Sequence, residues 1–382
     1  MADAVPPLDA EIRRLIKIAG PMPVRHYMSL CLTHAEHGYY MTRDPLGTEG
    51  DFTTSPEISQ MFGELIGLWM ASVWRRMGSP QSLRLIELGP GRGTMMLDAI
   101  RAARVMPGFR DALSVHLVET SPALQRRQRQ TLTGLETPVA WHQTLAEVPD
   151  GPTIVVANEF FDAVPVHQAV KKGDTWHERV VELDESGNLA FGIAADPIPN
   201  FVITLPRSVR DAPNGAIYEW RSNTMTVDLC RRIVNGGGAA LMIDYGHVTS
   251  SVGDTFQAVR AHGFANPLAS PGTVDLTAHV DFQAIALDAE TMGARVHGPI
   301  EQAEFLRRMG IDTRAEALKA VVTPTKAAEI DAAKMRLTAG GTTGMGSMFK
   351  VLGLSHPKLE SLPAFEKTTT GEPSDAAAVP VS

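Results

Sequence analysis

A run of glycines follows a short apolar stretch at residues 85–94, "LIELGPGRGT". Gly89, Gly91 and Gly93 alternate with other residues, and the acidic Glu87 stands two positions before the first of them. Glycine lets the backbone turn tightly and lets a ligand approach without a Cβ in its way. The helix that begins after such a turn suits a carboxylate, and Glu87 can orient the turn or meet an ammonium group. The spacing predicts a ligand-binding turn, although a purely structural strand-to-helix turn looks the same.

The glycine spacing differs from that of dinucleotide-binding proteins, whose turn reads Gly-x-Gly-x-x-Gly. The residues that would complete that pattern are Thr94, counted from Gly89, and Met96, counted from Gly91. The next apolar stretch, "SVHLVE", ends in Glu119, where a carboxylate can accept hydrogen bonds from both ribose hydroxyls of a nucleoside. Its charge would repel a 2′-phosphate, which argues against NADP. A solvated loop carboxylate is the alternative for Glu119.

Polar residues also end two further apolar stretches. Thr144 follows the third one, at a usual place for adenine contacts. The fourth, "TIVVAN", ends in Asn158 and is followed by Glu159 and Asp162 beside two phenylalanines. A group that reacts with the bound ligand would lie here. The alternative is a capped turn with two aromatic core residues.

A polar loop and an amphipathic helix at residues 50–64, "GDFTTSPEISQMFGE", come before all of these stretches. Thr54 and Glu57 have the spacing of a capping box, and Ser55 is a second candidate cap. We expect the loop to cover the open end of the site with polar groups from Asp51 and Glu57. The alternative is a structural cap without ligand contact. Four apolar residues at helical spacing are expected to be buried: Ile58, Met61, Phe62 and Leu65.

Composition excludes several classes of function. The chain has 382 residues, a formal net charge of −8 and no concentrated Lys/Arg face of the kind that nucleic-acid binding needs. No apolar stretch reaches the about 18 residues of a membrane span. His34-x-x-His37 lacks further ligands, so no metal is expected. Two distant cysteines, and an N-terminus that resembles neither a signal nor a transit peptide, predict a cytoplasmic protein.

The stretches alternate with helical segments such as 94–104 and 122–131, which predicts a doubly wound α/β sheet with its ligand at the carboxyl ends of the strands. About 80 residues separate the fourth and fifth strands, and their alternation and turns predict an inserted antiparallel hairpin or meander. Residues 347–354 are expected to form a last, edge strand. The expected organisation is a helical N-terminal segment covering the site (1–80), a core (81–162 and 236–356), an inserted β/α subdomain (163–235) and a disordered tail (363–382).

Taken together, these stretches resemble the MidA-type methyltransferases, the family that includes a mitochondrial complex I assembly factor that methylates a protein arginine. The glycine turn itself has the form seen in class I S-adenosylmethionine (SAM) methyltransferases. The resemblance covers most of the chain, residues 20–355, and is closest to a bacterial member because no presequence is evident. Its motifs are "HYMSLCLTHAEHGYYM", "GDFTTSPEISQMFGE", "IELGPGRGT", "NEFFDAVPV", "DLTAHVDF" and "MGSMFKVL".

The resemblance implies a Rossmann-like class I fold, SAM as cofactor and methylation of arginine on a protein. The acceptor that it suggests is a 49-kDa-type complex I subunit. The expected cofactor-binding residues are Glu87, Gly89, Gly91, Gly93, Glu119, Thr144 and Asn158. The expected acceptor-binding and catalytic residues are Glu159, Asp162, Glu57 and Asp51. A SAM-binding assembly chaperone without catalysis and a small-molecule methyltransferase are the alternatives. The sequence specifies neither the acceptor nor the oligomeric state.

Overall fold

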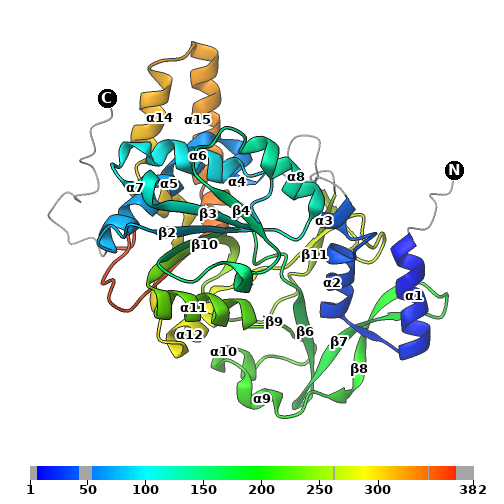
Figure 1. The fold of residues 1–382 in the computed structure, drawn as a ribbon. Helices are drawn as coiled ribbons and strands as arrows, with labels where there is room; N and C mark the ends of the chain where they lie inside the picture. Colours follow the sequence, from blue (N-terminus) through cyan, green and yellow to red (C-terminus); the bar gives the residue numbers. More distant parts are fainter. Residues whose placement is uncertain (1–6, 43–53, 261–262, 343, 367–382) are drawn as a thin grey trace. The chain divides into compact units, whose positions relative to one another are not determined.

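The computed structural model describes residues 7–42, 54–260, 263–342 and 344–366. These residues form two compact units, drawn together in Figure 1. The first, called the core unit below, comprises the described parts of 54–160, 224–246 and 285–366. The second, called the accessory unit, comprises the described parts of 7–42, 161–223 and 247–284.

The sheet of the core unit has the strand order β4-β3-β2-β5-β10-β16-β15. Its strands are parallel except β16, which pairs antiparallel with β10 and β15. The bounds are Leu83–Leu88 (β2), Leu113–Val118 (β3), Val139–His142 (β4), Thr153–Asn158 (β5), Gly238–His247 (β10), Arg295–Glu301 (β15) and Phe349–Ser355 (β16). The strand order reverses between β2 and β5, and sheets of this type bind ligands at the carboxyl ends of those strands. The doubly wound α/β sheet is therefore confirmed.

The last strand of the chain, β16, does not lie at the edge of the sheet, so that expectation is wrong. It lies between β10 and β15, and β15 forms the edge. The sequence of β15, "RVHGPIE", alternates exposed, half-buried and buried residues and has no continuous apolar run. β15 therefore lacks the apolar run by which the other parallel strands were recognised.

Helices cover both faces of this sheet, with α5 and α6 on one face and α11 on the other (Figure 1). The main core lies between α5, α6 and the sheet, and Phe62, Ile66 and Trp69 are fully buried in it. The bounds are Ser55–Ile58 (α4), Gln60–Arg76 (α5), Thr94–Ala102 (α6), Ala103–Val105 (η1), Phe109–Ala112 (α7), Pro122–Thr131 (α8), Leu145–Glu147 (η2), Thr224–Gly236 (α11), Phe282–Thr291 (α12), Gln302–Arg308 (α13), Ile311–Lys319 (α14), Pro324–Thr338 (α15) and Met345–Met348 (α16).

The helix expected after Thr54 is divided into two pieces. Ser59 is extended, with φ −161° and ψ 138°, and separates α4 from α5. Its hydroxyl accepts a hydrogen bond from the Met61 amide at 3.2 Å, so Ser59 is the residue that caps the long helix. Thr54 makes no side-chain cap bond, and the expected capping box with Glu57 does not form. Met61, Phe62 and Leu65 are buried as predicted, whereas Ile58 is only partly buried.

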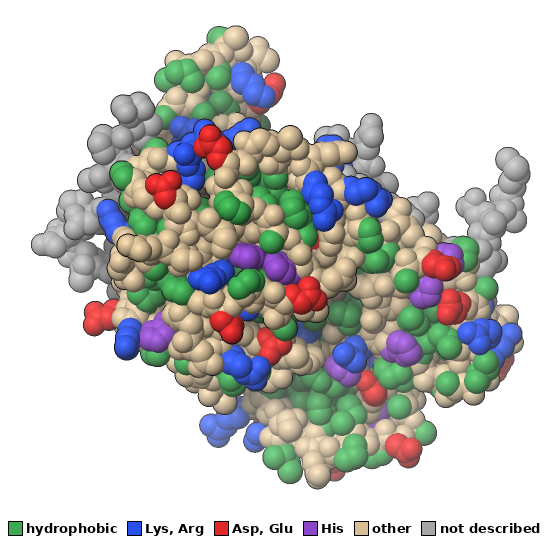
Figure 2. Space-filling view, viewed as in Figure 1, with side chains coloured by type: hydrophobic (Ala, Val, Ile, Leu, Met, Phe, Trp, Pro, Cys, Tyr) green, Lys and Arg blue, Asp and Glu red, His purple; other side chains and the backbone are tan. Residues whose placement is uncertain are grey.

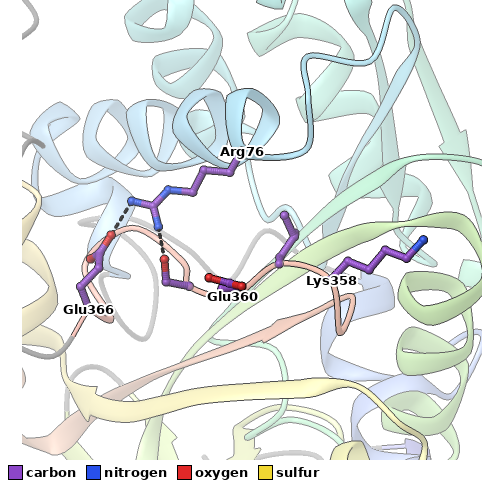
Figure 3. A pocket seen from close by; sticks show the side chains of 6 residues that line it. Arg76, Lys358, Glu360 and Glu366 are labelled. Carbon is purple, nitrogen blue, oxygen red and sulfur yellow. Dashed lines mark hydrogen bonds and ion pairs between the residues drawn. The ribbon is translucent and has the colours of Figure 1, made fainter.

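The segment after β16 packs against the core unit. The Trp69 indole N–H donates to the Pro363 carbonyl at 3.1 Å, and Leu362 is fully buried. Arg76, the last residue of α5, donates to Ser361 Oγ at 2.8 Å and pairs with Glu366 (Figure 3). Residues 363–366 therefore do not belong to a disordered tail, while residues 367–382 lie outside the described part of the chain. A pocket of about 440 Å³ is lined by Arg76, Lys358, Leu359, Glu360, Ser361 and Glu366, none of which was a predicted site residue.

The accessory unit contains the predicted antiparallel meander, formed by β6, β7 and β8. Strand β9 pairs with β6, and β1 pairs with β7. The strand bounds are Met22–Pro23 (β1), Val166–Lys172 (β6), Thr175–Leu183 (β7), Leu189–Pro197 (β8), Ile217–Arg221 (β9), Gln257–Arg260 (β11), Gly263–Ala265 (β12), Asp275–Thr277 (β13) and Val280–Asp281 (β14). The helix bounds are Pro7–Ala19 (α1), Val24–Thr33 (α2), Tyr39–Thr42 (α3), Phe201–Thr204 (α9) and Arg207–Arg210 (α10).

The division into units differs from the expected domain boundaries in two ways. Residues 54–80 group with the core unit and not with the rest of the expected segment 1–80. Residues 247–284 join the accessory unit together with most of the expected insertion 163–235.

Positive and negative side chains are interspersed on the face drawn in Figure 2. None of the helices in the described residues is long and apolar enough to span a membrane.

Candidate active site

The glycine turn of the core unit connects β2 with α6. The φ angles of Gly89, Gly91 and Gly93 are 61°, 52° and 81°, in the left-handed region that glycine adopts without steric cost. A Cβ atom on Gly89 would stand 2.8 Å from Cδ2 of Phe160, too close for any larger residue. Gly93 immediately precedes α6 and offers no side-chain cap to its first N–H groups. The turn thus has left-handed glycines and a helix start without a side-chain cap, and the group that approaches Gly89 most closely is the Phe160 ring.

Glu87 lies in β2, two residues before the turn, with 3% of its surface exposed. Its Oε2 atom has no hydrogen-bond partner among the described residues. Burial, and to a smaller extent repulsion by Glu119, raises the pKa of Glu87 to about 8. A buried carboxyl group without partners is stable either as the neutral acid or beside a cation. The position therefore fits a ligand with a positive charge.

Glu119 follows β3 and is held by its neighbours. Its Oε1 atom accepts from the Ser121 amide at 2.8 Å, and its Oε2 atom accepts from Gln128 Nε2 at 3.1 Å. Burial raises the pKa of Glu119, while these hydrogen bonds act in the opposite direction. The carboxylate has a fixed orientation at the end of β3, where acidic residues can accept from ribose hydroxyls.

Gln128, in α8, is a residue that sequence reasoning missed. It is fully buried, and its Nε2 also donates to the Gly91 carbonyl at 2.8 Å. Its Oε1 accepts from the Trp141 indole N–H at 2.9 Å. Gln128 therefore joins the glycine turn to Glu119. In the sequence, the position of Gln128 four residues after Leu124 indicates that both side chains lie on the same, buried side of the helix.

A strained turn follows β5. Glu159 has φ 51°, which is uncommon outside glycine and persists only where the surroundings hold it. Its amide donates to the Ile243 carbonyl at 2.9 Å. Its Oε1 accepts from the Ser55 amide at 2.9 Å and from Asn158 Nδ2 at 3.0 Å. Thus Asn158 and Glu159 lie together, as predicted, and Ser55 of α4 joins them.

Asp244, near the end of β10, supports this turn and was also missed. It is 1% exposed, and its Oδ2 accepts from the Phe160 amide at 3.2 Å. Its Oδ1 accepts from the Tyr245 amide at 2.9 Å. The signal was present in the sequence, because Asp244 ends an apolar stretch, "AALMID", just as Glu119 does.

Glu57 connects α4 with the glycine turn. Its Oε1 accepts from Thr94 Oγ1 at 2.6 Å, at the first residue of α6. Its Oε2 lies 3.8 Å from Arg92 Nη1, within the turn. An acidic group at a helix start is favourable because of the helix dipole. The structure thus brings Glu57 to the glycine turn, although not through the expected capping box.

The other predicted site residues are Thr144, Asp162 and Asp51. Thr144 is exposed in the loop after β4, where its hydroxyl donates to Glu147 at 3.3 Å. Asp162 belongs to the accessory unit, where its Oδ1 accepts from the Ala163 amide at 2.8 Å. Asp51 lies outside the described residues.

Three carboxyl groups, those of Glu87, Glu119 and Glu159, therefore stand at the carboxyl ends of the central strands. They lie near a turn whose three glycines have left-handed φ angles. A nucleoside with a cationic substituent matches both features, since Glu119 suits a ribose and Glu87 suits a positive charge. In the described residues, no group of three or more His, Cys, Asp or Glu side chains is arranged to hold a metal ion.

Comparisons with known proteins agree with this chemistry. Residues 65–300 match a family described as "Putative S-adenosyl-L-methionine-dependent methyltransferase". The chain is 39% identical to the mitochondrial protein arginine methyltransferase NDUFAF7 homolog of Drosophila melanogaster, over 91% of this chain and 84% of that protein. It is 38% identical to the mitochondrial NDUFAF7 of Homo sapiens, over 82% and 76% of the two chains. A crystal structure of a methyltransferase-type protein from Burkholderia thailandensis, bound to S-adenosyl-homocysteine (SAH), has a TM-score of 0.81 at 28% identity and 94% coverage of both chains.

These comparisons correct one expectation. The relatives from fly, frog and human are named mitochondrial proteins. This finding contradicts the cytoplasmic location that was expected from the cysteines and the N-terminus, since neither feature distinguishes the cytoplasm from another reducing compartment.

Proposed function

We propose that this chain, which belongs to the family of S-adenosyl-L-methionine-dependent methyltransferases, methylates arginine side chains of a protein substrate. The observation that carries this proposal is the carboxylate of Glu159, fixed beside the glycine turn of a SAM-binding sheet. Guanidinium is charged at neutral pH, so its binding site needs a carboxylate. The names of the curated relatives support the same acceptor.

The cofactor site is proposed to comprise Glu87, Glu119 and the glycines of the turn. Bound SAM supplies an electrophilic methyl group on a cationic sulfonium. Gly89, Gly91 and Gly93 leave room for its close approach, and Glu119 accepts from the ribose. The buried carboxylate of Glu87 offsets the positive charge of the amino acid part.

The acceptor site is proposed to lie at Glu159. Methyl transfer from a sulfonium is an in-line displacement, so orientation of the acceptor nitrogen contributes more than a strong base. Glu159 would align the guanidinium and offset its charge, and Glu57 would add a second carboxylate at the turn. Asp162, in the accessory unit, and Asp51, outside the described residues, stay predictions from the sequence alone.

A finer proposal concerns the acceptor protein. The family resemblance suggests a 49-kDa-type subunit of respiratory complex I, whose methylation would support assembly of the complex. This part rests on the resemblance alone.

Glu159→Gln tests the proposed function. Glutamine keeps an oxygen for the Ser55 and Asn158 donors but removes the charge. We expect SAM affinity within about twofold of the native protein and a loss of about 100-fold or more in methyl transfer. Transfer of tritiated methyl groups to protein, followed by mass spectrometry of methylarginine, measures this. Glu185→Gln, at an exposed loop position, is the control.

The same assay separates the alternatives. SAM binding without transfer to any acceptor would identify a chaperone. Label in small molecules instead of protein would identify a small-molecule methyltransferase. Undiminished transfer by Glu159→Gln would remove Glu159 from the acceptor site.

A further inference from the structure

Two buried oxygen atoms beside Glu159 lack hydrogen-bond partners among the described residues. One is the hydroxyl of Ser55, a residue with 0% of its surface exposed. The other is Oδ1 of Asn158, a residue that is 9% exposed. Buried polar atoms are nearly always paired, so each such atom requires an explanation. Hydrogen-bond donors of a bound ligand would pair both atoms.

Ser55 and Asn158, the residues that carry these two oxygens, both donate a hydrogen bond to the same atom of Glu159. The Ser55 amide and Asn158 Nδ2 both donate to Glu159 Oε1, at 2.9 and 3.0 Å. A carboxylate can only accept, so the Asn158 amide must turn its NH₂ group toward Glu159. Its carbonyl oxygen then points elsewhere. The Ser55 amide likewise donates to Glu159, whereas the Ser55 hydroxyl has no hydrogen-bond partner among the described residues.

The character of these atoms specifies the ligand that they fit. An amide oxygen is purely an acceptor, and a hydroxyl can accept as well as donate. Both lie next to a carboxylate, so a ligand with several donors and a positive charge satisfies all three groups. A guanidinium has five N–H donors in one plane and no acceptor, whereas an ammonium is a compact point charge with three donors.

The surroundings of this cluster are held in place. The left-handed turn at Glu159 is fixed by the Ile243 carbonyl, and the next amide is bound by Asp244 at 3.2 Å. The ring of Phe160 lies close to Gly89 of the cofactor turn. The cluster is thus rigid and adjacent to the place where the methyl donor is proposed to bind.

We propose that Ser55 and Asn158 form, with Glu159, the subsite for the guanidinium of the substrate arginine. Ser55 Oγ and Asn158 Oδ1 accept from its N–H groups, and the Glu159 carboxylate faces its charge. This inference rests on the proposed function. It assigns an acceptor-binding role to Ser55, which sequence reasoning had treated only as a helix start, and moves Asn158 from the cofactor to the acceptor.

The experiment compares Ser55→Ala with Ser59→Ala, four residues along the same segment. The Ser59 hydroxyl caps α5 and is outside the proposed subsite. Methylguanidinium chloride serves as the probe, titrated by calorimetry into the full chain saturated with SAH. Methylammonium chloride is the control for charge alone, and SAM affinity and melting temperature are measured for each variant.

The native protein should bind methylguanidinium at least fivefold more tightly than methylammonium. Ser55→Ala should weaken methylguanidinium binding at least fivefold, keep SAM affinity within twofold and melt no lower than the native protein, because the lost hydroxyl had no partner. Ser59→Ala should melt lower but bind the probe within twofold of the native protein. Asn158→Leu removes both the acceptor oxygen and the donor NH₂ group of the side chain. It should weaken methylguanidinium binding to the same extent as Ser55→Ala.

Three results would overturn the subsite. They are unchanged probe affinity in Ser55→Ala, loss of SAM binding in that variant, and no saturable binding of methylguanidinium to the SAH-saturated native protein. In each case SAM binding and methylarginine formation by the native protein would leave the proposed function intact. Failure of the native protein to bind SAM would instead reject the proposed function together with the subsite.

Discussion

At the scale of single residues, the buried carboxyl group of Glu87 makes cofactor binding depend on pH. Burial raises its pKa to about 8 from the usual 4.5. Between these values the folded, ligand-free protein keeps a proton that the unfolded chain releases. Its stability therefore falls as pH rises through this window. A cationic ligand needs the ionised form, so binding must expel that proton at lower pH.

We expect SAM affinity to rise up to about tenfold per pH unit from about pH 6 to about pH 8, and to level off above. Glu87→Gln should weaken binding at pH 8 and remove this rise, because glutamine does not titrate. Calorimetry in buffers of different ionisation enthalpy measures both the affinity and the proton release. The exposed Glu185→Gln should behave like the native protein. A pH profile shared by the native protein and Glu87→Gln would show that another group is responsible.

Residues that end apolar stretches could be identified from the sequence, since a polar side chain there interrupts a clear pattern. Glu87, Glu119 and Glu159 were predicted as site residues in this way, and the structure places them at the carboxyl ends of β2, β3 and β5. Ser59 and Gln128 were not predicted. The role of Ser59 depends on where one helix ends and the next begins, and the role of Gln128 depends on the residues that face its helix. Glu57 was found for its spacing with Thr54, yet it bonds Thr94 instead. The spacing of Thr54 and Glu57 within one segment does not determine whether the Glu57 carboxylate bonds within that segment or to Thr94 in another helix.

At the scale of elements, buried parallel strands were predictable because both of their faces are apolar. Five strands of the core unit, β2, β3, β4, β5 and β10, and helices α6 and α8 appear where the pattern placed them. The edge strand β15 and the packed segment after β16 did not show such a pattern. The segment 363–366, Pro-Ala-Phe-Glu, is too short to show a periodic pattern.

The packed C-terminal segment leads to a prediction about stability. Leu362 is fully buried in the main core and lies against Gly353, whose added Cβ would be 2.8 Å from Leu362 Cδ1. Leu362→Ala should lower the free energy of unfolding by about 2–5 kcal/mol, since it removes buried methyl groups and leaves a cavity. Leu359→Ala, at a half-buried position three residues earlier, should cost about 1 kcal/mol or less.

Denaturant unfolding of both variants measures this difference. Equal, small losses for the two variants would mean that the segment does not contribute to the core in solution. SAM affinity should be unchanged in both, because neither leucine belongs to the cofactor site.

At the scale of the whole molecule, the chain builds two units from segments that alternate along the sequence. The insertion after β5 was predictable from its length and its alternating pattern. The joining of residues 247–284 to it was not, because that depends on contacts between distant segments. Arg221 is one such contact, since it donates to the carbonyls of Val164, Ala278 and His279. A single arginine in one strand carries no sequence signal for partners about 60 residues away along the chain.

Each unit has hydrophobic clusters of its own, and this leads to a prediction for hydrogen exchange. Exchange reports local opening, and a ligand slows it where its contacts hold the backbone. We expect saturating SAH to slow exchange in the glycine turn and in α4, where Glu57 and Ser55 contact the turn and Glu159. The β7–β8 hairpin of the accessory unit should exchange at the same rate with and without SAH. Exchange followed by mass spectrometry of peptides resolves these regions, and Glu119→Ala should abolish the protection by weakening cofactor binding. Equal protection of the β7–β8 hairpin would show that the cofactor stabilises both units and that its site is not confined to the core unit.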